Sequence, residues 1–288
     1  MPKNPGYDRR SVLRFGPLYV VDAGKRCFVM RKWALCLLFC LLVGSACSVD
    51  EVPLPEPVEM PVPMARELSM EPIAEYDEKT PPEVPPGRIA YITIDDGPSE
   101  AVTPRILDIL RIEGVRATFF VLPHEGVDHI YERILNEGHA VGNHSYSHDY
   151  KRLYDKGDDG VFFREDVLRA GHWLEERFGH ETDLFRFPGG SESWDKDVIA
   201  RRREILEELG YRVFDWDVSN GDTDRSPAGR DPEMLTANVM ARATDERDRL
   251  IVLMHDTGNK AATAEALPRV IMRLKAAGYG FDTLEGYR

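Results

Sequence analysis

Cysteine is scarce in this chain of 288 residues, and it is confined to the N-terminal end. All four cysteines lie before residue 48, namely Cys27, Cys36, Cys40 and Cys47. The rest of the chain can therefore contain neither a disulfide nor a thiolate metal site. Any metal bound there must be held by nitrogen and oxygen ligands, which histidine and carboxylate side chains supply.

The sequence also lacks a cluster of basic residues. Its 37 lysines and arginines are outnumbered by 50 aspartates and glutamates, which gives a formal net charge of −13. Because phosphate binding needs Lys and Arg gathered on one surface, this composition argues against a nucleic-acid partner. No apolar stripe beyond the expected core faces indicates a protein partner, and we therefore expect a monomer.

No apolar run near the N-terminus is long enough for a typical membrane span of about 20 residues. The run at 33–43 follows three basic residues and precedes Gly44, Ser45, Ala46 and Cys47, which is the layout of a secretory signal. The small residues before Cys47 resemble a bacterial lipoprotein signal, in which that cysteine is lipidated. Gly44 departs from the Leu, Val or Ile usual three residues before the cysteine, so ordinary cleavage or an uncleaved anchor are alternatives.

We divide the chain into three parts: 1–47, 48–87 and 88–288. The first holds the signal, with Met30 at its natural start and an upstream extension without a fold of its own. The second contains ten of the 20 prolines and ten acidic residues against two basic ones. Such a composition predicts an extended, disordered tether that holds the third part away from a membrane surface.

From residue 88 onward, apolar runs alternate with amphipathic stretches. The runs lie at 89–94, 117–121, 139–142, 184–187, 211–216, 250–254 and 281–284. Thr103 and Pro104 indicate the N-cap and first position of a helix. Helical spacing also recurs in Val167, Leu168, Leu174 and Phe178, and in Ile199, Ile205 and Leu209, which we interpret as core faces. Seven strands interleaved with helices predict an α/β fold with a parallel sheet, as a barrel or as an open sheet.

Two motifs predict a metal site. Asp95 and Asp96 end the first strand, and a buried pair of like charges is costly unless a cation compensates it. His144 and His148 are four residues apart, a spacing that one helical turn would bring onto one face. One aspartate and two histidines form a three-ligand set with an open coordination position, as catalytic zinc requires.

The candidate residues also converge in space. Asp95, Asp96, His144, Arg186 and His255 all follow apolar runs, and the carboxyl ends of parallel strands share one edge, where α/β folds place their chemistry. Alone, an Asp-Asp pair is more often a turn or a cap, and a His pair is more often a solvated helix face. Together at one edge, they favour a functional site.

Five clusters in this order resemble the polysaccharide deacetylases, the NodB-homology domain of carbohydrate esterase family four. The clusters are TIDDGP at 93–98, NHSYSH at 143–148, RFPGG at 186–190, WDVSNGDT at 216–223 and LMH at 253–255. The resemblance covers roughly residues 88–288. It implies a distorted (β/α)7-type barrel and an enzyme that hydrolyses the N-acetyl group of an aminosugar.

The resemblance also implies roles for individual residues. Asp96, His144 and His148 correspond to the ligands of a zinc ion, which cobalt or nickel can replace in vitro. Asp95 corresponds to the catalytic base and His255 to the catalytic acid. Arg186 corresponds to the residue that orients the base, and Asp222 to the residue that holds the histidine. The N–H of Gly189 would stabilise the oxyanion, and Leu253 and Trp216 would line the acetyl pocket.

Three positions depart from the family pattern, at Gly189, Ser219 and Thr223. The first lacks an aromatic side chain, the second lacks an acid, and the third lacks a tryptophan that usually lines the acetyl pocket. These changes put the shape of the substrate in question rather than the reaction. We interpret Trp173 as a core residue and Trp194 as either part of a rim loop or a ring that stacks on a sugar. The remaining histidines are interpreted as structural or solvated: His124, His129, His139, His172 and His180.

Location and chemistry together predict an exported, membrane-anchored deacetylase whose glycan substrate is peptidoglycan. Chitin oligosaccharides and acetylated xylan are alternative substrates, because the same catalytic groups would serve. A glycan-binding lipoprotein that has lost catalysis is an alternative of another class. Such a protein would be expected to lose Asp95 or His255 first, and both are present.

Overall fold

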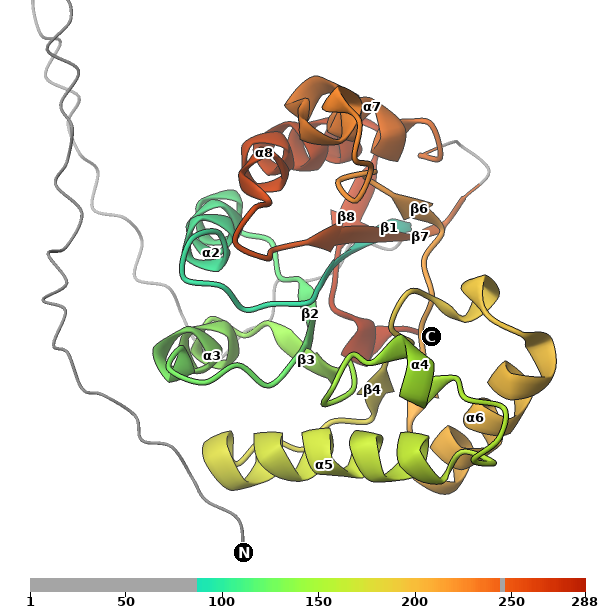
Figure 1. The fold of residues 1–288 in the computed structure, drawn as a ribbon. Coiled ribbons are helices and arrows are strands. Elements are labelled where there is room, and N and C mark those ends of the chain that lie inside the picture. Colours follow the sequence, from blue (N-terminus) through green and yellow to red (C-terminus); the bar gives the residue numbers. More distant parts are fainter. Residues whose placement is uncertain (1–86, 244–246) are drawn as a thin grey trace, which may run out of the picture. The chain divides into compact units, whose positions relative to one another are not determined.

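The computed structural model describes residues 87–243 and 247–288. In these residues, strands and helices alternate, and the helices lie outside a parallel sheet (Figure 1). The predicted signal with Met30 and Cys47 and nearly all of the tether lie outside the described residues. The strands are β1 (Arg88–Asp95), β2 (Thr118–Val121), β3 (Ala140–Asn143), β4 (Leu184–Phe185), β5 (Arg212–Val213), β6 (Val218–Ser219), β7 (Arg249–His255) and β8 (Tyr279–Phe281).

The α-helices follow the strands in the chain and differ widely in length. They are α2 (Thr103–Glu113), α3 (Asp128–Asn136), α4 (Tyr150–Leu153), α5 (Val161–Phe178), α6 (Lys196–Glu208), α7 (Pro232–Met240) and α8 (Ala261–Ala276). Short 3-10 helices lie at Ser191–Ser193, Pro227–Arg230 and Leu284–Gly286. Within the described ranges, no helix is both long and apolar enough to cross a membrane.

The sheet is a curled, incomplete barrel. Its strand order is β5-β4-β3-β2-β1-β7-β6, and β8 pairs with the beginning of β1. The two strands at the ends of this order, β5 and β6, follow each other in the chain, but no pairing joins them within the described residues. The predicted distorted barrel of βα units is therefore confirmed, with a seam between β5 and β6.

Strand β1 shows how the barrel uses its two faces. Ile92 and Ile94 belong to the apolar cluster shared with α2 and α8, outside the sheet. Tyr91 belongs to a separate cluster on the inner face. Because successive side chains of a strand point to opposite faces, Thr93 and Asp95 lie on the inner face with Tyr91. The alternation along one strand thus carries a buried carboxylate to the carboxyl-end opening of the barrel.

Two predicted strand boundaries were wrong. The run 211–216 contains only the two-residue β5, and the unpredicted β6 follows it at Val218–Ser219. The last strand is Tyr279–Phe281, and Leu284 begins a 3-10 helix instead of continuing the predicted run. Short edge strands are difficult to predict because neighbouring strands, rather than their own pattern, determine where they pair.

Two helix assignments also need correction. Thr103 is not the N-cap of α2 but its first residue, and its hydroxyl donates to Asp256 Oδ2 at 2.5 Å instead of capping the helix. Leu168 was interpreted as part of a core face, yet it is 36% exposed on α5. The neighbouring Val167 is fully buried, so the core face of α5 passes beside Leu168 and not through it.

Candidate active site

The chain turns sharply after β1, so that two consecutive carboxylates approach the same point. Asp95 ends β1 and is 2% exposed. Asp96 has a φ of 74°, and its N–H donates to the carbonyl of Phe120 at 3.2 Å. In a continued strand the two side chains would point to opposite faces. Here His144 Nε2 lies 3.8 Å from Asp95 Oδ2 and 3.4 Å from Asp96 Oδ1.

The two predicted histidine ligands do not share a helical turn, so that expectation was wrong. His144 directly follows β3, and residues 144–149 form an irregular loop. Ser145 and His148 have φ values of 74° and 51°, which lie outside the α-helical region. The spacing of four residues therefore reflects a tight curl of the loop rather than a helix.

A buried carboxylate on α5 holds this loop. Asp166 Oδ1 accepts hydrogen bonds from the N–H groups of Tyr146 and Ser147, at 2.7 and 3.2 Å. The backbone curls around this carboxylate and carries the imidazole of His148 back toward β1. As a result, His148 Nε2 lies 3.2 Å from Asp96 Oδ1.

Three atoms with the chemistry of zinc ligands converge here. An oxygen of Asp96 and a ring nitrogen of His144 and of His148 lie within 4.8 Å of one another. Bonds of about 2.0–2.1 Å at tetrahedral angles separate ligand atoms by about 3.3 Å, close to the 3.4 and 3.2 Å observed between Asp96 and the two imidazoles. His144 Nδ1 donates to the carbonyl of Arg186 at 2.9 Å, which leaves Nε2 for a ligand bond. These residues fit a divalent metal.

Arg186 is fully buried, and its guanidinium joins Asp95 to the barrel seam. Nη1 donates to Asp95 Oδ1 at 2.8 Å and to Thr93 Oγ1 at 2.6 Å. Nε and Nη2 donate to the carbonyls of Phe214 and Asp215, at 2.9 and 3.2 Å, in the segment between β5 and β6. One side chain therefore fixes the orientation of Asp95 and bridges the open side of the sheet.

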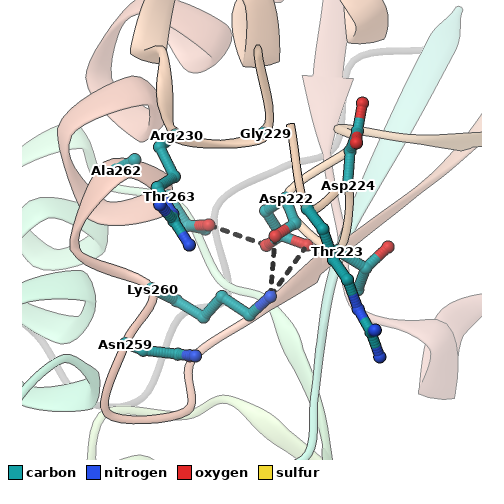
Figure 2. A pocket seen from close by; sticks show the side chains of 10 residues that line it. Asp222, Thr223, Asp224, Gly229, Arg230, Asn259, Lys260, Ala262 and Thr263 are labelled. Atoms are coloured by element: carbon teal, nitrogen blue, oxygen red, sulfur yellow. Dashed lines mark hydrogen bonds and ion pairs between the residues drawn. The ribbon is translucent and has the colours of Figure 1, made fainter. Parts of the chain in front are cut away.

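Asp222 holds His255 through both carboxylate oxygens. Oδ1 accepts from His255 Nδ1 at 2.8 Å, and Oδ2 accepts from the His255 backbone N–H at 2.9 Å. The hydroxyl of Thr263 donates to Oδ2, and the ammonium of Lys260 donates to the Asp222 carbonyl, both at 2.7 Å (Figure 2). Burial disfavours a charged imidazole, but the hydrogen bond and charge of Asp222 outweigh burial and raise the pKa of His255.

Comparison with known proteins agrees with this geometry. The model of the polysaccharide deacetylase family matches residues 83–214. A peptidoglycan-N-acetylglucosamine deacetylase of Bacillus cereus is 32% identical over 200 residues, which make up 68% of this chain and 86% of that protein. The chain belongs to the polysaccharide deacetylase family. The resemblance seen in the five sequence clusters is thereby confirmed.

Two further matches differ in how much of the matched protein this chain covers. The peptidoglycan-N-acetylglucosamine deacetylase PgdA of Listeria monocytogenes is 35% identical over 210 residues, 71% of this chain, but the chain spans only 40% of that protein. The solved structure of a Streptococcus mutans CE4 esterase matches with a TM-score of 0.62 and 32% identity, covering 69% of this chain and 86% of that one. The family match ends at residue 214, so the pairing of Asp222 with His255 rests on the geometry described above.

Gly189, the predicted oxyanion donor, has a φ of 75°, and its N–H donates no hydrogen bond within the described residues. The N–H is therefore available to a ligand. A Cβ placed on Gly189 would lie 3.5 Å from Trp194 and 3.6 Å from Tyr150, whose rings are 5.1 Å apart. Two aromatic rings thus lie beside Gly189.

The two predicted lining residues lie on different elements. Leu253 is in β7, 4% exposed, and in register with Thr93 on β1. Trp216 is half-buried before β6, and its ring packs against Gly190, where a Cβ would lie 2.5 Å from the ring. Gly190 is therefore required for Trp216 to occupy this position.

Two residues that support the Asp95–Asp96 turn were not predicted as part of the site. His124, interpreted as structural or solvated, donates from Nε2 to the carbonyl of Asp96 at 3.0 Å. Asp256 is fully buried, and burial raises its pKa to about 7. A Cβ on Gly97 would lie 2.0 Å from Asp256 Oδ1, which explains the glycine in the first motif. The only sequence signal for Asp256 was its position directly after His255.

The loop held by Asp166 leads to a prediction. Asp166→Ala removes the acceptor for two backbone N–H groups, so the curl that positions His148 loosens although no ligand is changed. We expect zinc affinity to fall by about 10–100-fold, as is typical when residues that orient metal ligands are lost. Isothermal titration calorimetry with zinc measures this. Glu165→Ala, which removes an exposed neighbouring carboxylate from the same helix, is the control, and equal affinities for the two variants would contradict the prediction.

Proposed function

We propose that this protein is a metal-dependent deacetylase that hydrolyses N-acetyl groups of N-acetylglucosamine residues in peptidoglycan. The observation that carries the proposal is the register of β1 and β7, in which Asp95 and His255 are Cα partners at the carboxyl ends of the two strands. A candidate base and a candidate acid therefore stand side by side. The possible metal ligands Asp96, His144 and His148 lie next to the base.

The first half of the reaction needs a nucleophile. Asp95 accepts a proton from water, and the water oxygen attacks the acetyl carbonyl carbon. A divalent metal held by Asp96, His144 and His148 would supply polarisation of the carbonyl and a lowered water pKa. Arg186 keeps the Asp95 carboxylate oriented, since it donates to Oδ1 and leaves Oδ2 directed toward the imidazole of His144.

The second half of the reaction needs an acid. An amine leaves poorly unless it is protonated, so cleavage of the C–N bond requires a proton at the nitrogen. His255 donates this proton from Nε2, because Nδ1 is bound to Asp222. The raised pKa of His255 favours the charged imidazole that this step requires. The free N–H of Gly189 donates to the oxyanion before the bond breaks, and the products are acetate and a free aminosugar.

The test of this proposal is acetate release from defined glycans. The protein is incubated with an N-acetylglucosamine pentamer, digested peptidoglycan and acetylated xylan, each with and without a chelator, and losses of acetyl mass are followed by mass spectrometry. We expect chelator-sensitive loss that added zinc restores, with peptidoglycan fragments preferred. Absence of loss from every glycan, even with added zinc, would favour the alternative of a glycan-binding protein without catalysis.

The pairing of Asp222 with His255 predicts a change in pH dependence. Asp222→Asn removes the negative charge that raises the pKa of His255, while burial continues to lower that pKa. The imidazole then loses its proton at a lower pH, so the alkaline limb of kcat against pH should move to lower pH. Rate profiles of the unsubstituted protein and of Asp222→Asn measure the shift. Superimposable alkaline limbs would exclude His255 as the proton donor.

We propose further that the protein is exported and anchored to a membrane through a lipid on Cys47, with residues 48–87 as the tether. Support comes from the sequence pattern before Cys47 and from relatives named for action on peptidoglycan, which is an extracellular polymer. Labelled palmitate should be incorporated by the expressed protein and lost in Cys47→Ser. Labelling that persists in this variant would rule out lipidation at Cys47.

A further inference from the structure

A pocket of about 200 Å³ lies beside the Asp222–His255 pair (Figure 2). One wall is the loop 222–230 after β6, and the other is the segment 259–263 at the start of α8. Pockets that enclose a whole drug-sized ligand measure about 300–1,000 Å³, so this one suits a substituent of a larger molecule. Asp222 belongs both to the pocket and to the pair with His255, so the pocket adjoins the candidate acid.

Three cationic side chains and two carboxylates line the pocket, although the chain as a whole carries −13. Arg225, Arg230 and Lys260 all line it. Within residues 87–243 and 247–288, neither of the two guanidinium groups has a hydrogen-bond or ion-pair partner. Several other arginines of the described domain are paired, as Arg202 is with Asp158 at 2.9 Å. Two unpaired arginines in one recess are suited to an anion that is absent from the protein itself.

The two carboxylates of the pocket are already engaged. Asp222 is bound to His255 and Thr263, as described above. Asp224 accepts from the N–H and the hydroxyl of Ser226, at 2.8 and 2.9 Å. Neither forms an ion pair with the arginines, so these carboxylates do not occupy the guanidinium groups.

The backbone conformation of the loop places Arg225 and Arg230 around the same pocket. Gly229 is buried, and a Cβ there would lie 2.1 Å from the carbonyl oxygen of Asp224. The turn at Pro227–Arg230 can therefore fold back onto residue 224, which places Arg225 and Arg230 around the same pocket. Any side chain at Gly229 would open this turn.

We propose that this pocket binds a carboxylate carried by the sugar next to the reacting N-acetylglucosamine. The inference rests on the proposed function and narrows its substrate class to acidic glycans. Guanidinium groups bind carboxylates through paired N–H donors, so a site lined by arginines favours carboxylates over neutral hydroxyl groups. In peptidoglycan the neighbouring sugar bears a lactyl group or a stem peptide with carboxylates, whereas chitin carries no such group. The pocket therefore selects peptidoglycan over chitin.

The experiment compares binding and acetate release for three peptidoglycan tetrasaccharides. One carries free lactyl carboxylates, the second carries their methyl esters, and the third carries stem peptides. The unsubstituted protein should bind the free acid about tenfold more tightly than the ester, and the double variant Arg225→Gln/Arg230→Gln should bind both equally. Arg242→Gln removes an exposed arginine that does not line this pocket and should keep the preference. Lys260 is left unchanged because it contacts Asp222.

The outcomes separate this inference from the proposed function. A preference for the acid that disappears in the double variant supports the pocket assignment, and the peptide-bearing glycan shows which carboxylate is bound. Equal binding of acid and ester by the unsubstituted protein, or a preference that survives in the double variant, overturns the assignment. Acetate release is measured in parallel. If the binding preference follows the arginines but no glycan loses acetate, the pocket assignment stands and the proposed function fails.

Discussion

Asp95→Asn is expected to abolish acetate release while the protein retains its metal. A carboxamide cannot accept the proton of the attacking water, and loss of a general base typically lowers kcat by a factor of about 10²–10⁴. The fold should survive, because the carboxamide oxygen introduced at this position can still accept the hydrogen bond that Arg186 donates to Oδ1. Acetate release and zinc content of the purified variant measure the two halves of the prediction.

The neighbouring residue supplies a matched control. Asp96→Asn makes the same chemical change one position later, but Asp96 contacts both imidazoles of the proposed ligand set. We expect this variant to lose zinc affinity, so that its activity depends on the zinc concentration. Asp95→Asn should show no such dependence. The assignment of base and ligand would be wrong if Asp95→Asn lost zinc and Asp96→Asn did not.

Arg186→Met should lower the free energy of unfolding by about 3–5 kcal/mol and also abolish activity. Removing one partner of a buried ion pair leaves the other charge uncompensated, which is far more costly than losing an exposed pair. Here the remaining charge is on Asp95, 2% exposed. The carbonyls of Phe214 and Asp215 lose their donors at the same time, so the barrel seam is weakened. Urea denaturation followed by circular dichroism measures the change.

Two comparisons test whether the buried charge is the cause. Arg212→Met breaks an exposed pair with Asp183, and its cost should stay below about 1 kcal/mol. In the double variant Arg186→Met/Asp95→Asn the uncompensated carboxylate is gone, so part of the lost stability should return. A loss for Arg186→Met no larger than that for Arg212→Met would show that the buried pair is not the main contribution.

The positions of Asp95 and His255 at strand ends were predictable because the signals for strands are local. Asp95 lies on the inner face because a strand alternates its side chains, and this periodicity can be read from β1 alone. His255 ends the apolar run that forms β7, and it is the Cα partner of Asp95 on the neighbouring strand. The parallel α/β arrangement also follows from alternating strand and helix patterns, so the sheet edge that carries the chemistry was predictable before its geometry was known.

The conformation of the second motif was not predictable from its spacing. His144 and His148 suggested a helical turn, but the turn is absent, and the loop depends on a carboxylate 20 residues further along the chain. Left-handed conformations of Ser145 and His148 are unfavourable in isolation and persist only where surrounding structure compensates their cost. No pattern within residues 143–148 contains that compensation.

Local periodicity was therefore sufficient for the fold class, and the five motifs were sufficient for the family and for the candidate ligands, base and acid. Tertiary structure alone decided how these groups are held. Arg186 reaches Asp95 across 91 positions of sequence, and the arginine-lined pocket forms only when the loop after β6 meets the start of α8. The reason is physical: strand alternation is a property of consecutive residues, whereas a buried hydrogen bond between distant residues contributes only after the chain has brought both partners together.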